Sequence, residues 1–209
     1  MKTHQVFAAY DRDVTAEHSW VYCPVCGSGL IRPTKGEPAK TCANPTCAFV
    51  LYRNPTPIIA VLIVDGDKFL LCRRKRETFE GGKWCPPCGY IEFHEDYLTA
   101  GRREVKEETG LEVEITALLS VASNFLRPDI HTLAVAVLAK PVGGAICPGD
   151  DVDELGWFSL GDKLPNFAFS ADRHMVERYF ATCLSGAPVD LAYATTRQDR
   201  LAAPSRRGS

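Results

Sequence analysis

The sequence has no long apolar run and no strong excess of either charge. Its longest apolar stretch, Ile58 to Val64, falls well short of the roughly 20 residues that a membrane-spanning helix needs. No continuous apolar segment lies near Met1, so we expect no secretory signal and a cytoplasmic protein without a membrane partner. The net charge of −2, from 24 basic and 26 acidic residues, gives no overall bias toward nucleic acid or membrane surfaces.

Cysteine, by contrast, is abundant. The 209 residues include nine cysteines, and this odd number without an export signal favours thiolates that bind metal over disulfides. The length suits one domain of ordinary size, with or without a small appendage. Two Pro-containing dipeptides, Asn54-Pro55 and Thr56-Pro57, mark a linker. The expected divisions are an N-terminal extension (1–19), a cysteine-rich segment (20–52), a main domain (55–183) and a C-terminal tail (184–209) whose end lacks any sustained pattern.

The main domain alternates strand and helix patterns. Apolar and β-branched runs predict strands at Ile58–Val64, Lys68–Arg73, Leu111–Val121, His131–Ala139 and Leu155–Phe158. Helices are predicted at Glu95–Thr109, with Gly110 as its C-cap, and at Ser170–Cys183. Strands surrounding two helices predict an α/β protein, a three-layer α/β/α fold with a mixed sheet.

The first predicted helix carries an unusual set of like charges. Glu104, Glu107 and Glu108 have i, i+3 and i+4 spacing and so share one helical face. Like-charge pairs at this spacing each cost a few tenths of a kcal/mol, so a cation is needed to offset them. Mg²⁺ commonly binds a few carboxylates together with waters and substrate phosphates. A solvated, charge-rich surface helix is the alternative interpretation.

The stretch from Gly89 to Leu111 resembles the signature of the Nudix hydrolases. After Gly89 come five residues, Glu95, seven residues, and then the run Arg103-Glu104-Val105-Lys106-Glu107-Glu108-Thr109-Gly110-Leu111, which matches at every fixed position. The later sequence "DELGWFSL" is similar to a strand and loop usual in that family. The resemblance implies a Nudix-type α/β/α sandwich over residues 55–183 that hydrolyses a nucleoside diphosphate linked to another moiety.

The resemblance also implies roles for the residues of the signature. The ligands of one or more Mg²⁺ or Mn²⁺ ions would be Glu104, Glu107, Glu108 and the Gly89 carbonyl. Arg103 would hold a glutamate in place, and Glu95 would support the site. A bound metal lowers the pKa of a coordinated water, and a carboxylate then accepts its proton. Candidates for this base are Glu107, Glu108, Asp153 and Glu154, although the last two lie in what is otherwise a polar loop.

Four early cysteines form two pairs. Cys23-x2-Cys26 is followed after fifteen residues by Cys42-x4-Cys47, a pattern that predicts a closed site of four thiolates for structural Zn²⁺. A segment of this size buries little core, so a metal would stabilise it. A zinc ribbon before a Nudix domain resembles a subgroup that includes the NADH, ADP-ribose and FAD pyrophosphatases. Few basic residues lie between the pairs, so nucleic acid is not favoured as a partner. A structural role is the preferred interpretation, and a homodimer interface is one place where the ribbon could have it.

A second motif, Cys85-Pro-Pro-Cys88, directly precedes Gly89. Three interpretations remain open for this pair: small buried side chains beside a strand, a redox-active pair, or a metal site.

The substrate is less clear than the reaction. The Ser-Gln-Pro-Trp-Pro-Phe-Pro motif of the NADH pyrophosphatases is absent, and the corresponding region reads "SVASNFLRPDIHTLAV". ADP-ribose, FAD and similar small dinucleotides are therefore the expected substrates. The alternatives are a binding module that senses a nucleotide without turnover and a hydrolase that acts on capped RNA.

Overall fold

A computed structural model describes residues 4–11, 20–32, 39–182 and 186–189. Their contacts divide the chain into two units. Within the described residues, the larger unit comprises 4–7, 57–124, 132–182 and 186–189, and the smaller comprises 8–11, 20–32, 39–56 and 125–131. We call the smaller one the ribbon unit. None of the described helices combines the length and the apolar character needed to cross a membrane.

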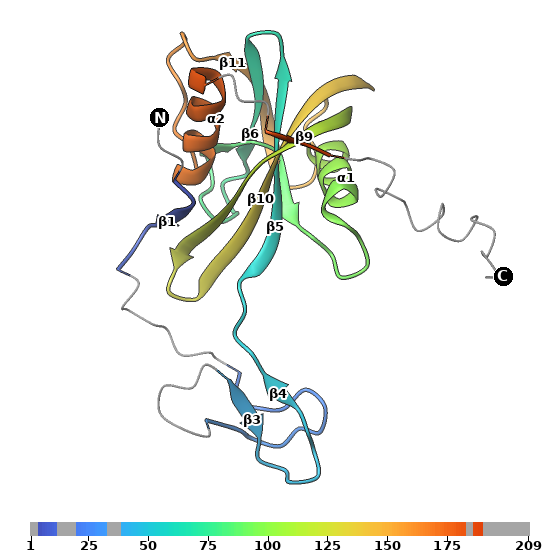
Figure 1. Ribbon diagram of the computed structural model, residues 1–209, viewed down its shortest axis with the longest axis vertical. Helices are drawn as coiled ribbons and strands as arrows, with labels where there is room; N and C mark the ends of the chain where they lie inside the picture. The colour runs from blue at the N-terminus through green and yellow to red at the C-terminus, as the bar shows by residue number, and fades with distance from the viewer. Residues whose placement is uncertain (1–3, 12–19, 33–38, 183–185, 190–209) are drawn as a thin grey trace, which may run out of the picture. The chain divides into compact units, whose positions relative to one another are not determined.

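Nine of the described strands form the main sheet (Figure 1). Its path runs β1-β9-β10-β5-β6-β11, while β7 pairs with β6, β8 with β5 and β12 with β9. β5 and β6 are antiparallel neighbours, whereas β5 and β10 run in the same direction, so the sheet is mixed as predicted. The strands are β1 (Val6–Ala8), β5 (Thr56–Asp65), β6 (Lys68–Arg74), β7 (Trp84–Cys85), β8 (Cys88–Tyr90), β9 (Leu111–Arg127), β10 (Ile130–Gly144), β11 (Val152–Ser159) and β12 (Ala187–Pro188).

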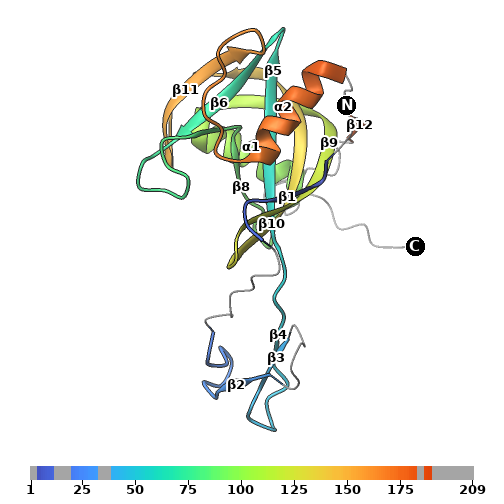
Figure 2. The ribbon, with the colours of Figure 1, turned by 90° about the vertical axis from the view of Figure 1, so that its left-hand side faces the viewer.

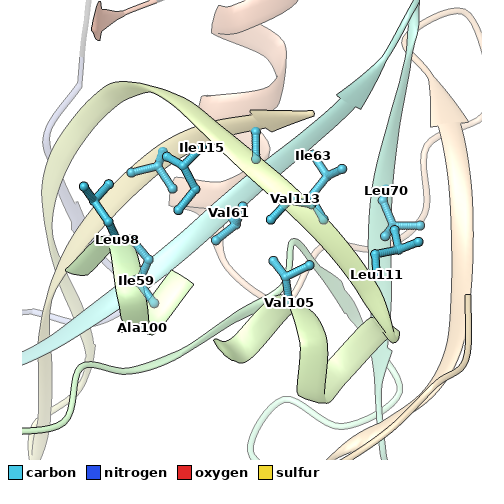
Figure 3. Close-up of a cluster of buried hydrophobic side chains, with 12 residues drawn as sticks. Ile59, Val61, Ile63, Leu70, Leu98, Ala100, Val105, Leu111, Val113 and Ile115 are labelled. Atoms are coloured by element: carbon cyan, nitrogen blue, oxygen red, sulfur yellow. The ribbon is translucent and has the colours of Figure 1, made fainter. Parts of the chain in front are cut away.

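Two helices, α1 (Tyr97–Thr109) and α2 (Ser170–Thr182), cover opposite faces of this sheet (Figures 1 and 2). Side chains alternate along each strand, so β5 contributes to a core on both faces. The core beneath α1 contains Ile59, Val61, Ile63, Leu70, Leu98, Ala100, Val105, Leu111, Val113, Ile115, Val137 and Ala139 (Figure 3). The core beneath α2 contains Leu62, Phe69, Leu71, Ala117, Ala136, Leu138, Phe167, Met175 and Val176. This arrangement confirms the predicted α/β/α sandwich.

Helix α1 begins two residues later than predicted, and its cap explains why. Asp96 has an extended backbone, and its side chain accepts hydrogen bonds from the N–H groups of Leu98 and Thr99, both at 3.0 Å. Glu95 therefore lies outside the helix. At the other end Gly110 adopts a left-handed conformation with φ of 72°, as a C-cap requires.

The predicted strands are present, but several are longer than the sequence indicated. Leu111–Val121 is the first part of β9, which continues to Arg127, and His131–Ala139 is the first part of β10, which begins at Ile130 and continues to Gly144. The polar residues that flank the hairpin tip carry a weaker strand pattern, so sequence periodicity ended the strands early. Cys183, the expected end of the second helix, lies outside the described residues.

The ribbon unit has its own small sheet. In the described residues, β2 (Leu30–Ile31), β3 (Lys40–Cys42) and β4 (Val50–Leu51) pair in that order, and both pairings are antiparallel. The first cysteine pair precedes β2, and the second begins at the end of β3. A sheet this short cannot bury a core of its own that would hold it together.

Helix α2 itself carries one buried polar side chain in an unusual environment, Asp172. Asp172 is 7% exposed, and its Oδ2 has no hydrogen-bond partner. Burial raises the pKa of Asp172 to about 7, although the nearby positive charge of Arg74 acts in the opposite direction. The folded protein therefore keeps this carboxyl protonated over a pH range in which the unfolded chain releases the proton.

We predict that Asp172→Asn removes a pH dependence of stability. From about pH 4 to pH 7 the unfolded state binds fewer protons than the folded state at this site, so the free energy of unfolding of the wild type falls as pH rises. At pH 8 the variant should be more stable by on the order of 2 kcal/mol, with little difference at pH 4. Urea denaturation across this range measures the effect, and the exposed Asp67→Asn is the control. Equal pH dependence of wild type and Asp172→Asn would contradict the prediction.

Candidate metal centre and active site

Helix α1 presents the three predicted glutamates, Glu104, Glu107 and Glu108, in different environments; we call them the signature glutamates. Glu104 and Glu108 are 7% and 2% exposed, whereas the side chain of Glu107 is 49% exposed. Burial of two carboxylates on a helix that also packs against the core is costly unless charge or hydrogen bonds compensate it. The helix face therefore directs Glu104 and Glu108 toward β8, while Glu107 stays half exposed to solvent.

Arg103 is the main compensating group. Its Nη2 and Nε donate to the two oxygens of Glu95 at 2.6 and 3.1 Å, and its Nη1 donates to Glu104 at 2.7 Å and to Glu107 at 2.9 Å. Nη2 also donates to the Tyr90 carbonyl at 3.0 Å. One guanidinium thus joins the turn before α1, the helix itself and the end of β8.

Gly89 lies directly against the Glu104 carboxylate. A Cβ at position 89 would be 2.2 Å from the carboxyl carbon and from Oε1 of Glu104, and 2.4 Å from Oε2. Any side chain at position 89 would displace this carboxylate, so glycine is favoured here because of the close approach and not because of its backbone conformation. The backbone of β8 and the carboxylate therefore share one confined space, as expected of two groups that would bind the same cation.

Burial opposes ionisation of the carboxyl groups in this acidic cluster. Burial raises the pKa of Glu104, and the hydrogen bond from Arg103 only partly offsets it. Burial raises the pKa of Glu108 well above its usual value, even though the Cys88 N–H donates to Glu108 at 3.0 Å. Burial also opposes ionisation of Glu95, but hydrogen bonds from Arg103 and the Glu92 N–H outweigh it and lower the pKa of Glu95. A divalent cation would favour the ionised form of Glu104 and Glu108.

These carboxylates form an open set of ligands. Among the described residues, only the four early cysteines bring at least three ligand atoms all within 4.8 Å of one another. Glu104 and Glu107 reach toward Arg103, whereas Glu108 turns toward the Cys88 N–H. An open arrangement suits Mg²⁺ or Mn²⁺, which complete their shell with waters and substrate oxygens. The donor set and the confined space at Gly89 fit such an ion.

The structure separates the acids of this segment into two groups, with Asp150 and Asp151 in the loop before β11, and Asp153 and Glu154 in β11 itself rather than in a polar loop. Asp153 accepts a hydrogen bond from Nε of Arg73 at 2.7 Å, and Glu154 forms an ion pair with the same guanidinium. Both candidate bases are thus held at Arg73 rather than at Arg103, which holds Glu104 and Glu107.

Asp150 and Asp151, which the sequence analysis did not single out, lie nearer the site. Negative charge from Asp150 raises the pKa of Glu104, and that from Asp151 raises the pKa of Glu108. The loop that carries them packs on the end of α1, because the Gly149 N–H donates to the Glu108 carbonyl at 3.1 Å. Asp151 in turn accepts from Arg74 Nη2 at 2.9 Å. The run of acids in "GDDVDE" was visible, but sequence alone could not show which pair faces the helix.

The two cysteines of the Cys85-Pro-Pro-Cys88 motif lie beside the candidate metal site, since the Cys88 N–H donates to Glu108. Cys85 is buried, and its Sγ is 4.0 Å from that of Cys88. The hydrogen bond from Cys88 lowers the pKa of Cys85, but burial and nearby acidic groups raise it by more. The same hydrogen bond together with burial raises the pKa of Cys88 well above its usual value. Thiols of this kind are poor nucleophiles, which favours the first interpretation, small buried side chains.

The four early cysteines form a compact cluster in the ribbon unit. The sulfurs of Cys23 and Cys47 are 3.8 Å apart, and those of Cys26 and Cys42 are 3.4 Å apart. Four thiolates around one Zn²⁺ at the usual Zn–S bond length have sulfurs about 3.8 Å apart. The cysteine spacing of two and four residues therefore produces a cluster that fits a tetrahedral zinc ion.

Known proteins share this architecture. A family model of the NUDIX domain matches residues 54–179. The chain is 35% identical over 124 residues to an ADP-ribose pyrophosphatase of Methanocaldococcus jannaschii, covering 59% of this chain and 72% of that protein. It is 33% identical over 183 residues to the NAD-capped RNA hydrolase NudC of Deinococcus radiodurans, covering 83% of this chain and 61% of the relative. The chain thus spans less than two thirds of the length of this NudC protein.

Two solved structures of Nudix hydrolases are also similar to this chain. A NUDIX hydrolase from Nitrosomonas europaea superposes with a TM-score of 0.68 at 29% identity, covering 81% of this chain and 96% of that one. A MutT NUDIX hydrolase from Burkholderia pseudomallei has a TM-score of 0.55 at 31% identity, covering 60% and 98%.

We predict that Gly89→Ala folds normally but weakens binding of a divalent cation. The three atoms nearest to the new methyl group all belong to the Glu104 carboxyl group, at the far end of a flexible side chain, so the carboxylate shifts and the fold is retained. We expect Mn²⁺ affinity, measured by electron paramagnetic resonance, to fall by about tenfold, which corresponds to the loss of one properly placed ligand. Gly161→Ala is the control, because a Cβ at position 161 has no atom within 4 Å. Unchanged Mn²⁺ affinity in Gly89→Ala would show that Gly89 and Glu104 do not form part of a metal site.

Proposed function

The chain belongs to the Nudix hydrolase family, and on that premise we propose that it is a divalent-metal-dependent pyrophosphohydrolase. The proposed reaction is attack of water on a phosphoanhydride that joins a nucleoside diphosphate to another moiety. The observation that carries the proposal is the pair of buried carboxylates that α1 directs at β8: Glu104, which contacts Arg103 and Gly89, and Glu108, which accepts from the Cys88 N–H. A helix has no structural need for such a group.

The chain's own residues would divide the work as follows. Glu104, Glu107, Glu108 and the Gly89 carbonyl hold the cation, while Arg103 fixes the positions of Glu104 and Glu107 and is itself fixed by Glu95. When bound, Mg²⁺ or Mn²⁺ would screen the charge of the pyrophosphate and lower the pKa of a coordinated water.

A carboxylate must then accept the proton of the attacking water. Glu107 is the signature glutamate most exposed to solvent. Asp150 and Asp151 are the loop acids whose negative charges raise the pKa of Glu104 and of Glu108, respectively. We therefore add Asp150 and Asp151 to Glu107 and Glu108 as candidates for the base. They rank ahead of Asp153 and Glu154, which Arg73 holds and whose charges are not among the main causes of the pKa shifts of Glu104 and Glu108. A base must lie within hydrogen-bond reach of the water it activates.

For the substrate we propose ADP-ribose or a similar small dinucleotide. The support is the relative named ADP-ribose pyrophosphatase, of whose length this chain covers 72%. Release of a nucleoside monophosphate from ADP-ribose, FAD and NADH in the presence of Mg²⁺ or Mn²⁺ tests this choice directly.

We predict that Glu108→Gln abolishes metal-dependent hydrolysis while the protein stays folded. The amide keeps the shape of the buried side chain but removes the charge that a cation needs, so the rate should fall by at least about a hundredfold. AMP release from ADP-ribose measures the rate, and thermal unfolding checks the fold. Glu112→Gln is the matched control, because Glu112 is an exposed glutamate near the same helix that pairs with Lys106. Full activity of Glu108→Gln, or tight nucleotide binding by the wild type without turnover under either cation, would contradict the proposal, and the second outcome would indicate a nucleotide sensor.

A second candidate substrate is capped RNA. The observation in its favour is the alignment with NudC, which covers 83% of this chain. Residues 54–209 are a smaller share of the chain than that, so the alignment includes part of the ribbon unit. Comparing the rates on NAD-capped RNA and on free NAD distinguishes the two candidates. A much higher kcat/KM for the capped RNA would favour this substrate.

We further propose that residues 20–52, which make up most of the ribbon unit, are a zinc ribbon held by Cys23, Cys26, Cys42 and Cys47. We predict one zinc ion per chain, and that Cys47→Ser lowers zinc content and lets protease cleave within the ribbon, because the metal replaces the missing core. Cys147→Ser is the control, since Cys147 is exposed and outside the cluster. Zinc content is measured by a colorimetric chelator after denaturation, and equal content in both variants would argue against the site.

A further inference from the structure

The loop between β10 and β11, residues 145–151, is docked on the C-terminal end of α1. The Gly149 N–H donates to the Glu108 carbonyl at 3.1 Å, and a Cβ at position 149 would lie 2.2 Å from the Glu107 carbonyl oxygen. The loop therefore packs against the backbone of two signature glutamates. Whatever fixes this loop also determines where its two acids, Asp150 and Asp151, lie relative to the candidate metal site.

The backbone of this loop adopts a conformation that requires support. Asp150 has a φ of 47°, in the left-handed region that residues with a Cβ rarely adopt, although aspartate tolerates it better than most. Such a backbone persists where surrounding contacts hold it. The Val152 N–H closes the turn by donating to the Gly149 carbonyl at 3.0 Å, and further contacts come from the end of β6.

Two consecutive residues at the end of β6 hold the loop in different ways. The Lys75 N–H donates to the Asp151 carbonyl at 2.7 Å, and the Lys75 ammonium group donates to the Asp150 carbonyl. Arg74 instead reaches a side chain, because its Nη2 donates to Oδ2 of Asp151 at 2.9 Å. Lys75 therefore fixes the backbone of the loop, whereas Arg74 fixes the direction of the Asp151 carboxylate.

Arg74 holds Asp151 from a fixed position of its own. Its side chain is 13% exposed, and its Nε donates to the Phe79 carbonyl at 2.8 Å. Its backbone N–H donates to the Lys83 carbonyl, and its carbonyl accepts from the Gly82 N–H, both at 2.9 Å. The planar fork of a guanidinium makes the bonds to Phe79 and Asp151 together, which the single ammonium group of a lysine cannot do with the same geometry.

Placing a negative charge beside α1 has an electrostatic cost that Arg74 offsets. Asp151 and the buried Glu108 carry charges of the same sign, and the charge of Asp151 raises the pKa of Glu108. Without a positive partner, this repulsion would favour an Asp151 side chain turned away from the helix. The guanidinium of Arg74 supplies the partner at Oδ2 and leaves the second carboxylate oxygen of Asp151 for another contact.

We propose that Arg74 is a positioning residue for hydrolysis: it holds the Asp151 carboxylate at the end of α1, where this carboxylate orients the attacking water and accepts its proton. The water oxygen bonds to phosphorus as its proton passes to Asp151, and the P–O bond to the leaving phosphate group breaks with its electron pair on the leaving oxygen. The inference rests on the proposed function and deepens it, because it selects Asp151 among the candidate bases and names the residue that places it.

A double-mutant cycle tests whether Arg74 acts through Asp151. Rates are measured with the full-length protein on ADP-ribose at saturating Mg²⁺. A general base contributes about 10²–10⁴-fold, so Asp151→Asn should lower kcat by at least about a hundredfold. Arg74→Met should lower kcat by at least about tenfold with KM within about threefold of wild type, because the base is then present but misplaced. The double variant should be at most about threefold slower than Asp151→Asn alone, since the arginine then has no carboxylate to position.

Arg73→Met is the matched control, because this neighbouring arginine holds Asp153 and Glu154 instead. Its kcat should stay within about threefold of wild type. Arg74→Lys keeps the charge but not the fork, so it is the milder change to use if Arg74→Met does not fold. Its kcat should fall in the same direction, by at least about threefold.

Two further measurements do not depend on turnover. Hydrogen exchange of residues 145–152 should be faster in Arg74→Met than in wild type and unchanged in Arg73→Met, because only the first variant loses an anchor of the loop. Mn²⁺ affinity, measured by electron paramagnetic resonance, should stay within about threefold of wild type in Arg74→Met, because the signature glutamates are untouched.

The outcomes separate this inference from the proposed function. If wild type turns over, then full kcat in Arg74→Met, or a double variant slowed by the product of the two single effects, would overturn the inference and leave the proposed function intact. Unchanged hydrogen exchange in Arg74→Met would also overturn it, since Arg74 would then not hold the loop. Absence of turnover by the wild type would instead reject the proposed function, and this inference with it.

Discussion

Compensation of buried negative charge by one guanidinium is the constraint on which the rest of the larger unit depends. Arg103 hydrogen-bonds three carboxylates and a backbone carbonyl, and through them it ties the turn before α1 to the helix and to β8. Without it, Glu104 would be buried beside Gly89 with no nearby cation, and the cost of an unpaired buried charge would push the helix away from the strand. The arginine thus allows the fold to hold an acidic cluster in place before any metal arrives.

Two further arginines form ion pairs with the acidic residues near β11 and thereby determine where these residues lie. Arg74 holds Asp151 in the loop that packs on the end of α1, while Arg73, the preceding residue on β6, holds Asp153 and Glu154. Adjacent residues of a strand point to opposite faces, so consecutive arginines direct the acids of one short segment to different places. The charge available to the candidate metal site is therefore set by strand alternation as much as by the number of acidic residues.

Much of this could be predicted from sequence because helical spacing and signature spacing are local. The shared face of Glu104, Glu107 and Glu108, the cap at Gly110 and the sandwich architecture followed directly, and the family assignment is confirmed. Contacts between distant segments could not be predicted in the same way. The fit of Gly89 against Glu104, the choice of Asp151 over Asp153 and the burial of Cys85 depend on register and packing.

The distribution of thiols has a practical consequence. Of the described cysteines outside the cluster of Cys23, Cys26, Cys42 and Cys47, Cys72 and Cys85 are buried and Cys88 is partly covered, which leaves Cys147 as the exposed one. Its N–H donates to the Thr109 carbonyl at the last residue of α1, at 2.9 Å. A fluorophore or spin label attached to this sulfur would therefore sit one hydrogen bond from the helix that bears the signature glutamates, and would report on that helix without any substitution in it.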